Sequence, residues 1–143
     1  AEPYWNVRFS GGCEGMFSLT TLRSAPALWS AFEVASKNAD YPLEQVGTYI
    51  QPTNQGTNTH FECDIFYDPA KKADVQRAKR LYMEGSEALL KSGAFFSRPY
   101  GQFTSSVFKQ CSEATVSAMR RVKKIFDPNG IMNPGRLCFK EAQ

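Results

Sequence analysis

The sequence predicts an α+β fold in which one antiparallel sheet carries helices on a single face. Residues 60–67 alternate between apolar and polar side chains, as a strand with one buried face does. Residues 75–89 place apolar side chains at helical spacing, which is typical of a long helix packed on a sheet. With 143 residues the chain can build one hydrophobic core, so a single domain over 1–143 is predicted.

The N-terminal elements are two strands and a helix. Residues 5–9 are interpreted as a short strand in an irregular lead-in, and residues 15–22 are apolar and Thr-rich, which favours a second strand. Ser24 is a candidate N-cap with Pro26 in the first helical turn, and apolar residues at helical spacing follow. The helix is expected to end within 38–42.

The middle of the chain predicts a hairpin and a second helix. Residues 45–51 alternate like residues 60–67, so the two segments can pair. Asp68 followed by Pro69 predicts the start of the long helix, and Ser92-Gly93 predicts its end. Residues 94–97 are interpreted as a short strand.

Two C-terminal helices, at about 103–110 and 113–126, complete the order. Both crossovers in the β-α-β-β-α-β order contain a helix, which is the split β-α-β, ferredoxin-like arrangement. The two Pro/Asn/Gly turns that follow, within 127–136, indicate one fixed loop conformation.

Composition excludes several classes of protein. The net charge of +3 is too small to indicate nucleic-acid binding, and no apolar run reaches the roughly 20 residues that span a bilayer. The basic residues within 120–124 are interpreted as a solvated helix face, with a docking surface for an acidic partner as the alternative. Four widely spaced cysteines without metal-type spacing predict thiols in a reducing compartment, so a cytoplasmic protein is expected. These cysteines are Cys13, Cys63, Cys111 and Cys138.

The strand at 60–67 carries the first candidate site. His60, Glu62 and Asp64 share the face that alternates with the apolar one. This row is either a polar surface facing solvent or the wall of an active site that faces a cofactor held by another domain. Histidine suits the second role because it can accept or donate a proton near neutral pH.

Arg98 is the second candidate. It lies between aromatic residues and a Pro-Tyr-Gly turn, where its planar fork can hold a carboxylate or a phenolate, with Tyr100 as a further hydrogen-bonding group. The alternative is an edge arginine that packs along aromatic surface.

Four segments in order resemble the FAD-linked oxidases of the vanillyl-alcohol oxidase and p-cresol methylhydroxylase family. VKKIFDPNGIMNPGRL at 122–137 is similar to the closing signature of that wider family. HFECDIFYDP at 60–69 is similar to its central strand, and GAFFSRPYG at 93–101 to the segment that carries a substrate-binding arginine. GGCEGMFS at 11–18 is similar to a strand of its substrate (cap) domain.

The resemblance implies the C-terminal cap domain of a larger FAD-dependent oxidoreductase. Such a cap has a ferredoxin-like sheet that covers the flavin and orients a substrate for hydride transfer to flavin N5. The implied catalytic residues are His60 and Arg98, the substrate-binding residues Arg98, Tyr100 and Glu62, and the cofactor-binding residues Asn58, Asn133 and Arg136.

The resemblance also implies the partners. FAD would be bound mainly by an N-terminal FAD-binding domain that is absent from this chain, and the substrate would be a small anionic or aromatic molecule. The isolated chain, either an excised fragment or a natural short protein, is therefore expected neither to hold FAD tightly nor to turn over. No nucleic-acid or membrane partner is expected, and a homodimer is left open. The alternative is a stand-alone ferredoxin-like module that binds a ligand or another subunit without catalysis.

Two departures from the family, and the question of a covalent flavin link, limit what the resemblance implies. Phenol-oxidising members have a tyrosine directly before the arginine, where this chain has Ser97. Of the metal-binding motif of related 2-hydroxy-acid dehydrogenases, residues 53–60 retain only Asn58 and His60, so no metal site is predicted. Cys13 is the nearest nucleophile for a covalent flavin link.

Overall fold

The computed structural model describes residues 11–139. The chain divides into two compact units, Ala1–Ser97 and Arg98–Gln143, and each is described by itself. The strand predicted at 5–9 lies outside the described residues, and the assignment of 1–143 to a single domain stays a prediction.

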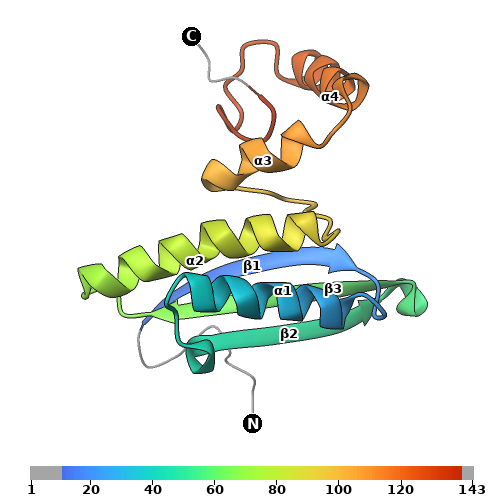
Figure 1. The fold of residues 1–143 in the computed structure, drawn as a ribbon. Helices are drawn as coiled ribbons and strands as arrows, with labels where there is room; N and C mark the ends of the chain where they lie inside the picture. The colour runs from blue at the N-terminus through green and yellow to red at the C-terminus, as the bar shows by residue number, and fades with distance from the viewer. Residues whose placement is uncertain (1–10, 140–143) are drawn as a thin grey trace. The chain divides into compact units, whose positions relative to one another are not determined.

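The first unit is a three-stranded antiparallel sheet with two helices on one face (Figure 1). The central strand β3 pairs with β1 on one side and with β2 on the other, so the strand order is β1-β3-β2. This confirms the α+β class and the antiparallel sheet. The elements are β1 (Gly12–Thr20), α1 (Ala25–Asn38), β2 (Val46–Thr53), β3 (Asn58–Tyr67) and α2 (Lys72–Lys91).

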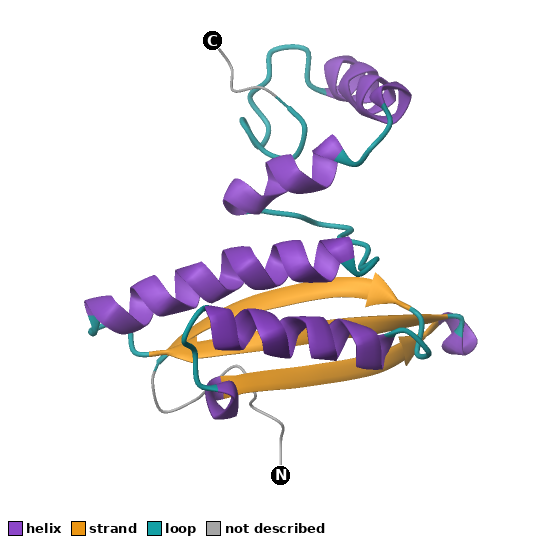
Figure 2. Ribbon diagram, viewed as in Figure 1, coloured by secondary structure: helices purple, strands orange, loops and turns teal. Residues whose placement is uncertain are grey.

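The hydrophobic core lies between the sheet and the two helices, which cover the same face of the sheet in Figure 2. Phe61, Cys63 and Ile65 of β3 are fully buried on this face, as their alternation predicts. Leu28 and Phe32, four residues apart on one face of α1, are fully buried as well. Burial of each such side chain contributes about 1.5–3 kcal/mol to folding.

The helix boundaries agree with the sequence at three of four ends. α1 follows Ser24, although the Ser24 hydroxyl bonds to Thr21 rather than capping the helix. α2 ends at Lys91, Ser92 is its C-cap, and the following Gly93 takes a left-handed φ of 89°. The prediction that α2 starts after Asp68-Pro69 is wrong, because the Asp68 carboxylate accepts the Ala70 N–H at 3.0 Å and closes a turn before the helix.

The predicted fourth strand is reduced to one bridge beside β1. Leu19 and Phe95 exchange two backbone hydrogen bonds, of 2.8 and 2.9 Å. The first unit then ends at Ser97, and Pro99 has no N–H with which to continue a ladder. The segment therefore occupies the position of a fourth strand, next to β1, without extending along it.

The second unit contains α3 (Thr104–Lys109) and α4 (Glu113–Phe126), which confirms both predicted C-terminal helices. A 3₁₀ turn at Gly101–Phe103 precedes α3. Ser112 caps α4, because its hydroxyl accepts the Thr115 N–H at 3.1 Å.

The two predicted turns follow α4. The Gly130 N–H bonds to the Asp127 carbonyl at 3.1 Å, and the Arg136 N–H bonds to the Asn133 carbonyl at 3.3 Å. Gly130, Asn133 and Gly135 all have left-handed φ values, between 49° and 70°. Glycine and asparagine adopt this conformation more readily than other residues, which explains their positions in the signature.

Candidate functional site

The open face of the sheet, which is the face away from α1 and α2, carries His60 and Glu62 at its centre. Phe17 of β1 and Tyr49 of β2 both pair with Glu62 in the antiparallel register. Paired residues in antiparallel strands point to the same face, so two aromatic rings flank the polar row of β3. Their centroids lie 6.0 Å (Phe17) and 5.8 Å (Tyr49) from that of His60. Both helices of the first unit, α1 and α2, lie on the opposite face (Figure 2).

His60 and Glu62 form a hydrogen-bonded pair. The distance between His60 Nε2 and Glu62 Oε2 is 2.8 Å, and the two side chains are 25% and 22% exposed. When Nε2 donates its proton to the carboxylate, Nδ1 carries the lone pair that can accept another proton. Asn58 lies two residues before His60 on the same face and is exposed. The structure therefore brings together the three predicted site residues of β3.

Asp64 lies next along the row and is 2% exposed. Burial, then the negative charge of Glu62 and a hydrogen bond with it, raise the pKa of Asp64 to about 6. Gly15 and Gly47 pair with Asp64 from both sides, and a Cβ on Gly15 would lie 3.3 Å from Asp64 Oδ1. Glycine at these positions leaves room for the carboxyl group, which is poised to hold a proton beside the His60–Glu62 pair.

Cys13 contacts the same carboxyl group, with 3.9 Å between its Sγ and Asp64 Oδ1. Burial and the neighbouring charge of Asp64 raise the pKa of Cys13 to about 11. The thiolate is the nucleophilic form, so a thiol that stays protonated at neutral pH is a weak nucleophile. This environment disfavours a covalent flavin link through Cys13.

We expect Asp64→Asn to stabilise the chain above pH 6 and to have little effect at pH 4. The pKa of Asp64 is raised from 3.8 to about 6, so its proton is lost from the folded state at a higher pH than from the unfolded chain. Stability is therefore lost as the pH rises through this window, by about 1–3 kcal/mol after allowance for solvent screening. Asparagine carries no such charge and should remove that loss.

Urea unfolding between pH 4 and 8 measures this effect. Glu44→Gln, at an exposed carboxylate before β2, is the matched control and should keep the wild-type pH dependence. A stability difference between Asp64→Asn and wild type that is the same at pH 4 and pH 8 would contradict the raised pKa.

The remaining predicted site residues lie in the second unit. Arg98 begins that unit and is exposed, and Tyr100 is 36% exposed. Asn133 and Arg136 lie in the second turn after α4 and are exposed. The seven residues thus divide into two sets, with Asn58, His60 and Glu62 in the first unit and Arg98, Tyr100, Asn133 and Arg136 in the second.

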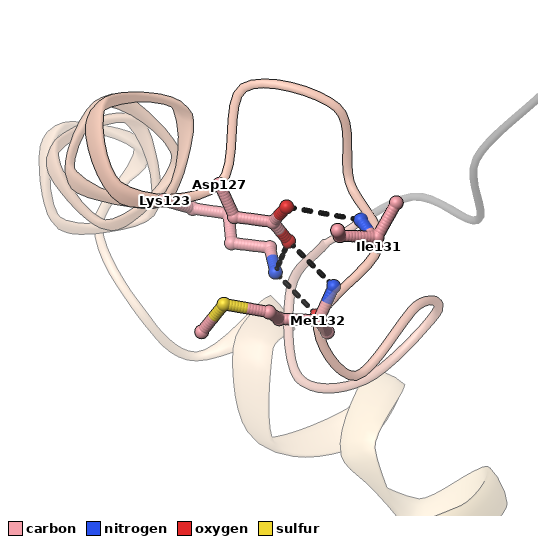
Figure 3. A network of polar contacts seen from close by, with 4 residues as sticks. All are labelled: Lys123, Asp127, Ile131 and Met132. Carbon is pink, nitrogen blue, oxygen red and sulfur yellow. Dashed lines mark hydrogen bonds and ion pairs between the residues drawn. The ribbon is translucent and has the colours of Figure 1, made fainter.

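Asp127 holds the loop after α4 in its conformation (Figure 3). Its carboxylate accepts the N–H groups of Ile131 at 2.9 Å and Met132 at 2.8 Å, and it pairs with Lys123. Lys123 also donates to the Met132 carbonyl, so the network closes on itself. The hydrogen bond from Lys123 makes the largest contribution to holding the pKa of Asp127 below its usual value, and the two backbone N–H groups add to it. The clamp leaves Ile131 and Met132 exposed, at 77% and 55%.

The sequence interpretation missed Phe17 and Tyr49 as parts of the site. Tyr49 belongs to a segment that alternates and Phe17 to one that is apolar and Thr-rich, but only the register places both beside His60. The clamp by Asp127 was also missed; the signal was an aspartate at a helix end followed by a Pro-Asn-Gly turn.

Two kinds of feature are missing from the part of the chain that the structure describes. Residues 11–139 contain no group of three or more His, Cys, Asp or Glu side chains that could hold a metal ion. Among the same residues, no helix combines the length and the apolar character needed to cross a membrane.

Comparison with known proteins identifies the family. None of the curated protein sequences matches the chain. A crystal structure of p-cresol methylhydroxylase with substrate bound is similar, with a TM-score of 0.68 and 18% sequence identity. The match covers 95% of this chain and 26% of that chain, and at this identity it shows the fold alone. The model of the family "FAD linked oxidases, C-terminal domain" matches residues 56–137, more than half of the chain. These residues include the central strand and both turns of the closing signature, and the chain belongs to the family of the C-terminal domain of FAD linked oxidases.

Proposed function

We propose that the chain is the substrate-binding cap of an FAD-linked oxidase or dehydrogenase. In this role it covers the flavin and orients an anionic or aromatic substrate for hydride transfer. The family implies the use of FAD and a role in oxidation and reduction. The observation that carries the finer proposal is the His60–Glu62 pair between two aromatic rings on the open face of the sheet.

The open face fits a flavin and a planar substrate. Phe17 and Tyr49 provide apolar ring surface on either side of the row, and Asn58 offers an exposed amide on the same face. In the second unit, Asn133 and Arg136 offer exposed polar groups at the second turn. When bound, FAD supplies the acceptor for the hydride.

The chain's own residues would bind the substrate and move its proton. Glu62 fixes the imidazole of His60 through Nε2, so that Nδ1 can accept a proton from a substrate hydroxyl as the hydride leaves. Arg98 would hold an anionic substrate group through its planar fork, with Tyr100 as a second donor. The rings of Phe17 and Tyr49 would keep bulk water from the reacting atoms.

An exposed apolar surface on the second unit supports a domain partner. Val122, Ile125 and Phe126 recur at helical spacing on α4 and are between 53% and 77% exposed. Ile131 and Met132, in the loop that the Asp127 clamp holds, are also exposed. Exposed apolar patches mark interfaces. The chain spans 26% of the p-cresol methylhydroxylase chain, and an N-terminal FAD-binding domain of the same protein is the proposed partner.

We expect Arg98→Ala in the full-length protein to raise KM about tenfold or more while the flavin content stays unchanged, because the lost contact is to substrate. Arg98→Lys should recover only part of the loss, since an ammonium cannot form the bidentate contact. Steady-state kinetics and the flavin absorbance of the purified protein measure both effects.

Arg23→Ala, at an exposed arginine in the turn before α1, is the matched control and should leave KM unchanged. Wild-type kinetics of Arg98→Ala would remove Arg98 from the site. A full-length protein that binds no flavin would favour the non-catalytic binding module instead.

A further inference from the structure

A basic cavity opens on the second unit, and none of the residues proposed for catalysis lines it. Its volume is about 430 Å³, within the range of small-ligand pockets. The lining residues come from the end of α4, from the first turn and from the C-terminal segment. They are Arg120, Lys123, Lys124, Asp127, Pro128, Gly130 and Phe139.

The cations of this cavity differ in how they are engaged. Arg120 donates through Nε to the Cys138 carbonyl at 3.1 Å, which fixes the guanidinium while its two terminal nitrogens keep their donors. Lys123 is paired with Asp127. Within residues 11–139, the side-chain ammonium of Lys124 has no hydrogen bond or ion pair. Three cations and one carboxylate leave the lining with a net charge of +2, carried by Arg120 and Lys124.

Two observations make this cavity more than a solvated helix face. The Asp127 clamp fixes the backbone of the first turn, so the wall formed by Pro128 and Gly130 is held in place before any ligand arrives. The ring of Phe139 lies 5.5 Å from the Lys123 ammonium and forms an apolar wall. A fixed wall, a fixed guanidinium and an aromatic surface together lower the entropic cost of binding.

The cavity can stay open when a domain covers the apolar surface of α4. Arg120, Lys123 and Lys124 recur at helical spacing, as Val122, Ile125 and Phe126 do. With 3.6 residues per turn, the two sets lie on opposite sides of the helix. A partner that packs on the apolar side therefore leaves the basic side accessible.

We propose that this cavity binds the phosphate group of a small phosphorylated molecule. Phosphate carries close to two negative charges at neutral pH and matches the two uncompensated cations. A guanidinium fork and an ammonium point charge are its usual protein partners. Phe139 and Pro128 would contact the apolar part of the same ligand.

Titration of the full 143-residue chain with inorganic pyrophosphate and with phenyl phosphate, followed by NMR at constant ionic strength, tests the proposal. We expect saturable shifts confined to residues of the cavity, with a Kd on the order of 0.1–1 mM. Lys124→Gln and Arg120→Gln should each weaken binding about tenfold, the usual size for loss of a charge-assisted contact. Lys124→Arg should retain binding, because it keeps the positive charge. Phe139→Leu should weaken the binding of phenyl phosphate more than that of pyrophosphate.

Arg121→Gln is the matched control, since Arg121 is exposed on the same helix and does not line the cavity. It removes the same charge and should leave the affinity unchanged. An equal loss of affinity in Arg121→Gln would mean that the ligands are attracted only by the general positive charge of the helix, which would overturn the proposal. Chemical shift changes that do not saturate would overturn it as well. Titration with FAD separates two sources of the phosphate group. If FAD binds as tightly as pyrophosphate, the ligand of the cavity is the diphosphate of the cofactor. If FAD binds more weakly, the ligand is another phosphorylated molecule.

Discussion

His60→Gln in the full-length protein is expected to lower the rate of flavin reduction by substrate about 10²–10³-fold, the usual contribution of a positioned general base. Glutamine can keep a hydrogen bond to Glu62 but has no lone pair able to accept a proton at neutral pH. Flavin content and substrate binding should change little, because the side chain is replaced by one of similar size. Stopped-flow absorbance of the flavin under anaerobic conditions measures the rate directly.

Gln51→Ala is the matched control for this experiment. Gln51 pairs with His60 in the register and shares the open face, but its amide cannot accept a proton at neutral pH. Its loss should change the reduction rate no more than about threefold, a size typical of a lost peripheral contact. If the flavin is reduced by substrate at similar rates in the His60→Gln and Gln51→Ala variants, His60 is part of a polar surface and not of the catalytic machinery.

Phe32→Ala is expected to destabilise the first unit by about 3–5 kcal/mol, the usual cost of emptying a buried aromatic site. Phe32 is fully buried, and its ring stacks on Trp29 with 5.9 Å between centroids. Gly85 of α2 makes this packing possible, because a Cβ there would lie 2.9 Å from Phe32 Cε2. Helix α2 thus has no side chain at this position that could fill the space left by the ring.

Urea unfolding followed by circular dichroism measures the loss. Val34→Ala is the matched control on the same helix, since Val34 is 57% exposed and its truncation should cost below about 0.5 kcal/mol. Equal midpoints for the two variants would mean that the contact between α1 and α2 does not support the sheet.

Local patterns predicted most of the elements correctly. The alternation of β3 identified the faces of Phe61 and His60 because period-two burial is a property of one strand. The end of α2 just before Ser92-Gly93 was predictable for the same reason, since the left-handed φ at Gly93 depends on that residue alone. The start of α2 was missed because an Asp-Pro pair serves equally as a helix cap and as a turn, and the surrounding backbone determines which one forms.

The site was predictable only along one strand. Asn58, His60 and Glu62 were found because they alternate on β3, whereas Phe17 and Tyr49 reach the site across the ladder. For β1 the register depends on pairing with β3, where Phe17 and its partner Glu62 are 45 residues apart in the sequence (62 − 17), so no local pattern encodes it. The same limit applies to Cys13, whose pKa is raised by burial and by Asp64, and to Asp64, whose pKa is raised by burial and by Glu62.

The sequence by itself determined the α+β class, the two polar and apolar faces of β3 and the two turns of the closing signature. Each of these follows from the conformational preferences or the periodicity of residues that are neighbours in the chain. Tertiary structure alone decided that Phe17 and Tyr49 flank His60, that Asp127 clamps the loop, and that Phe139 completes a basic cavity with α4. These features join side chains that the chain brings together only when it folds, because hydrogen bonding and burial act between neighbours in space.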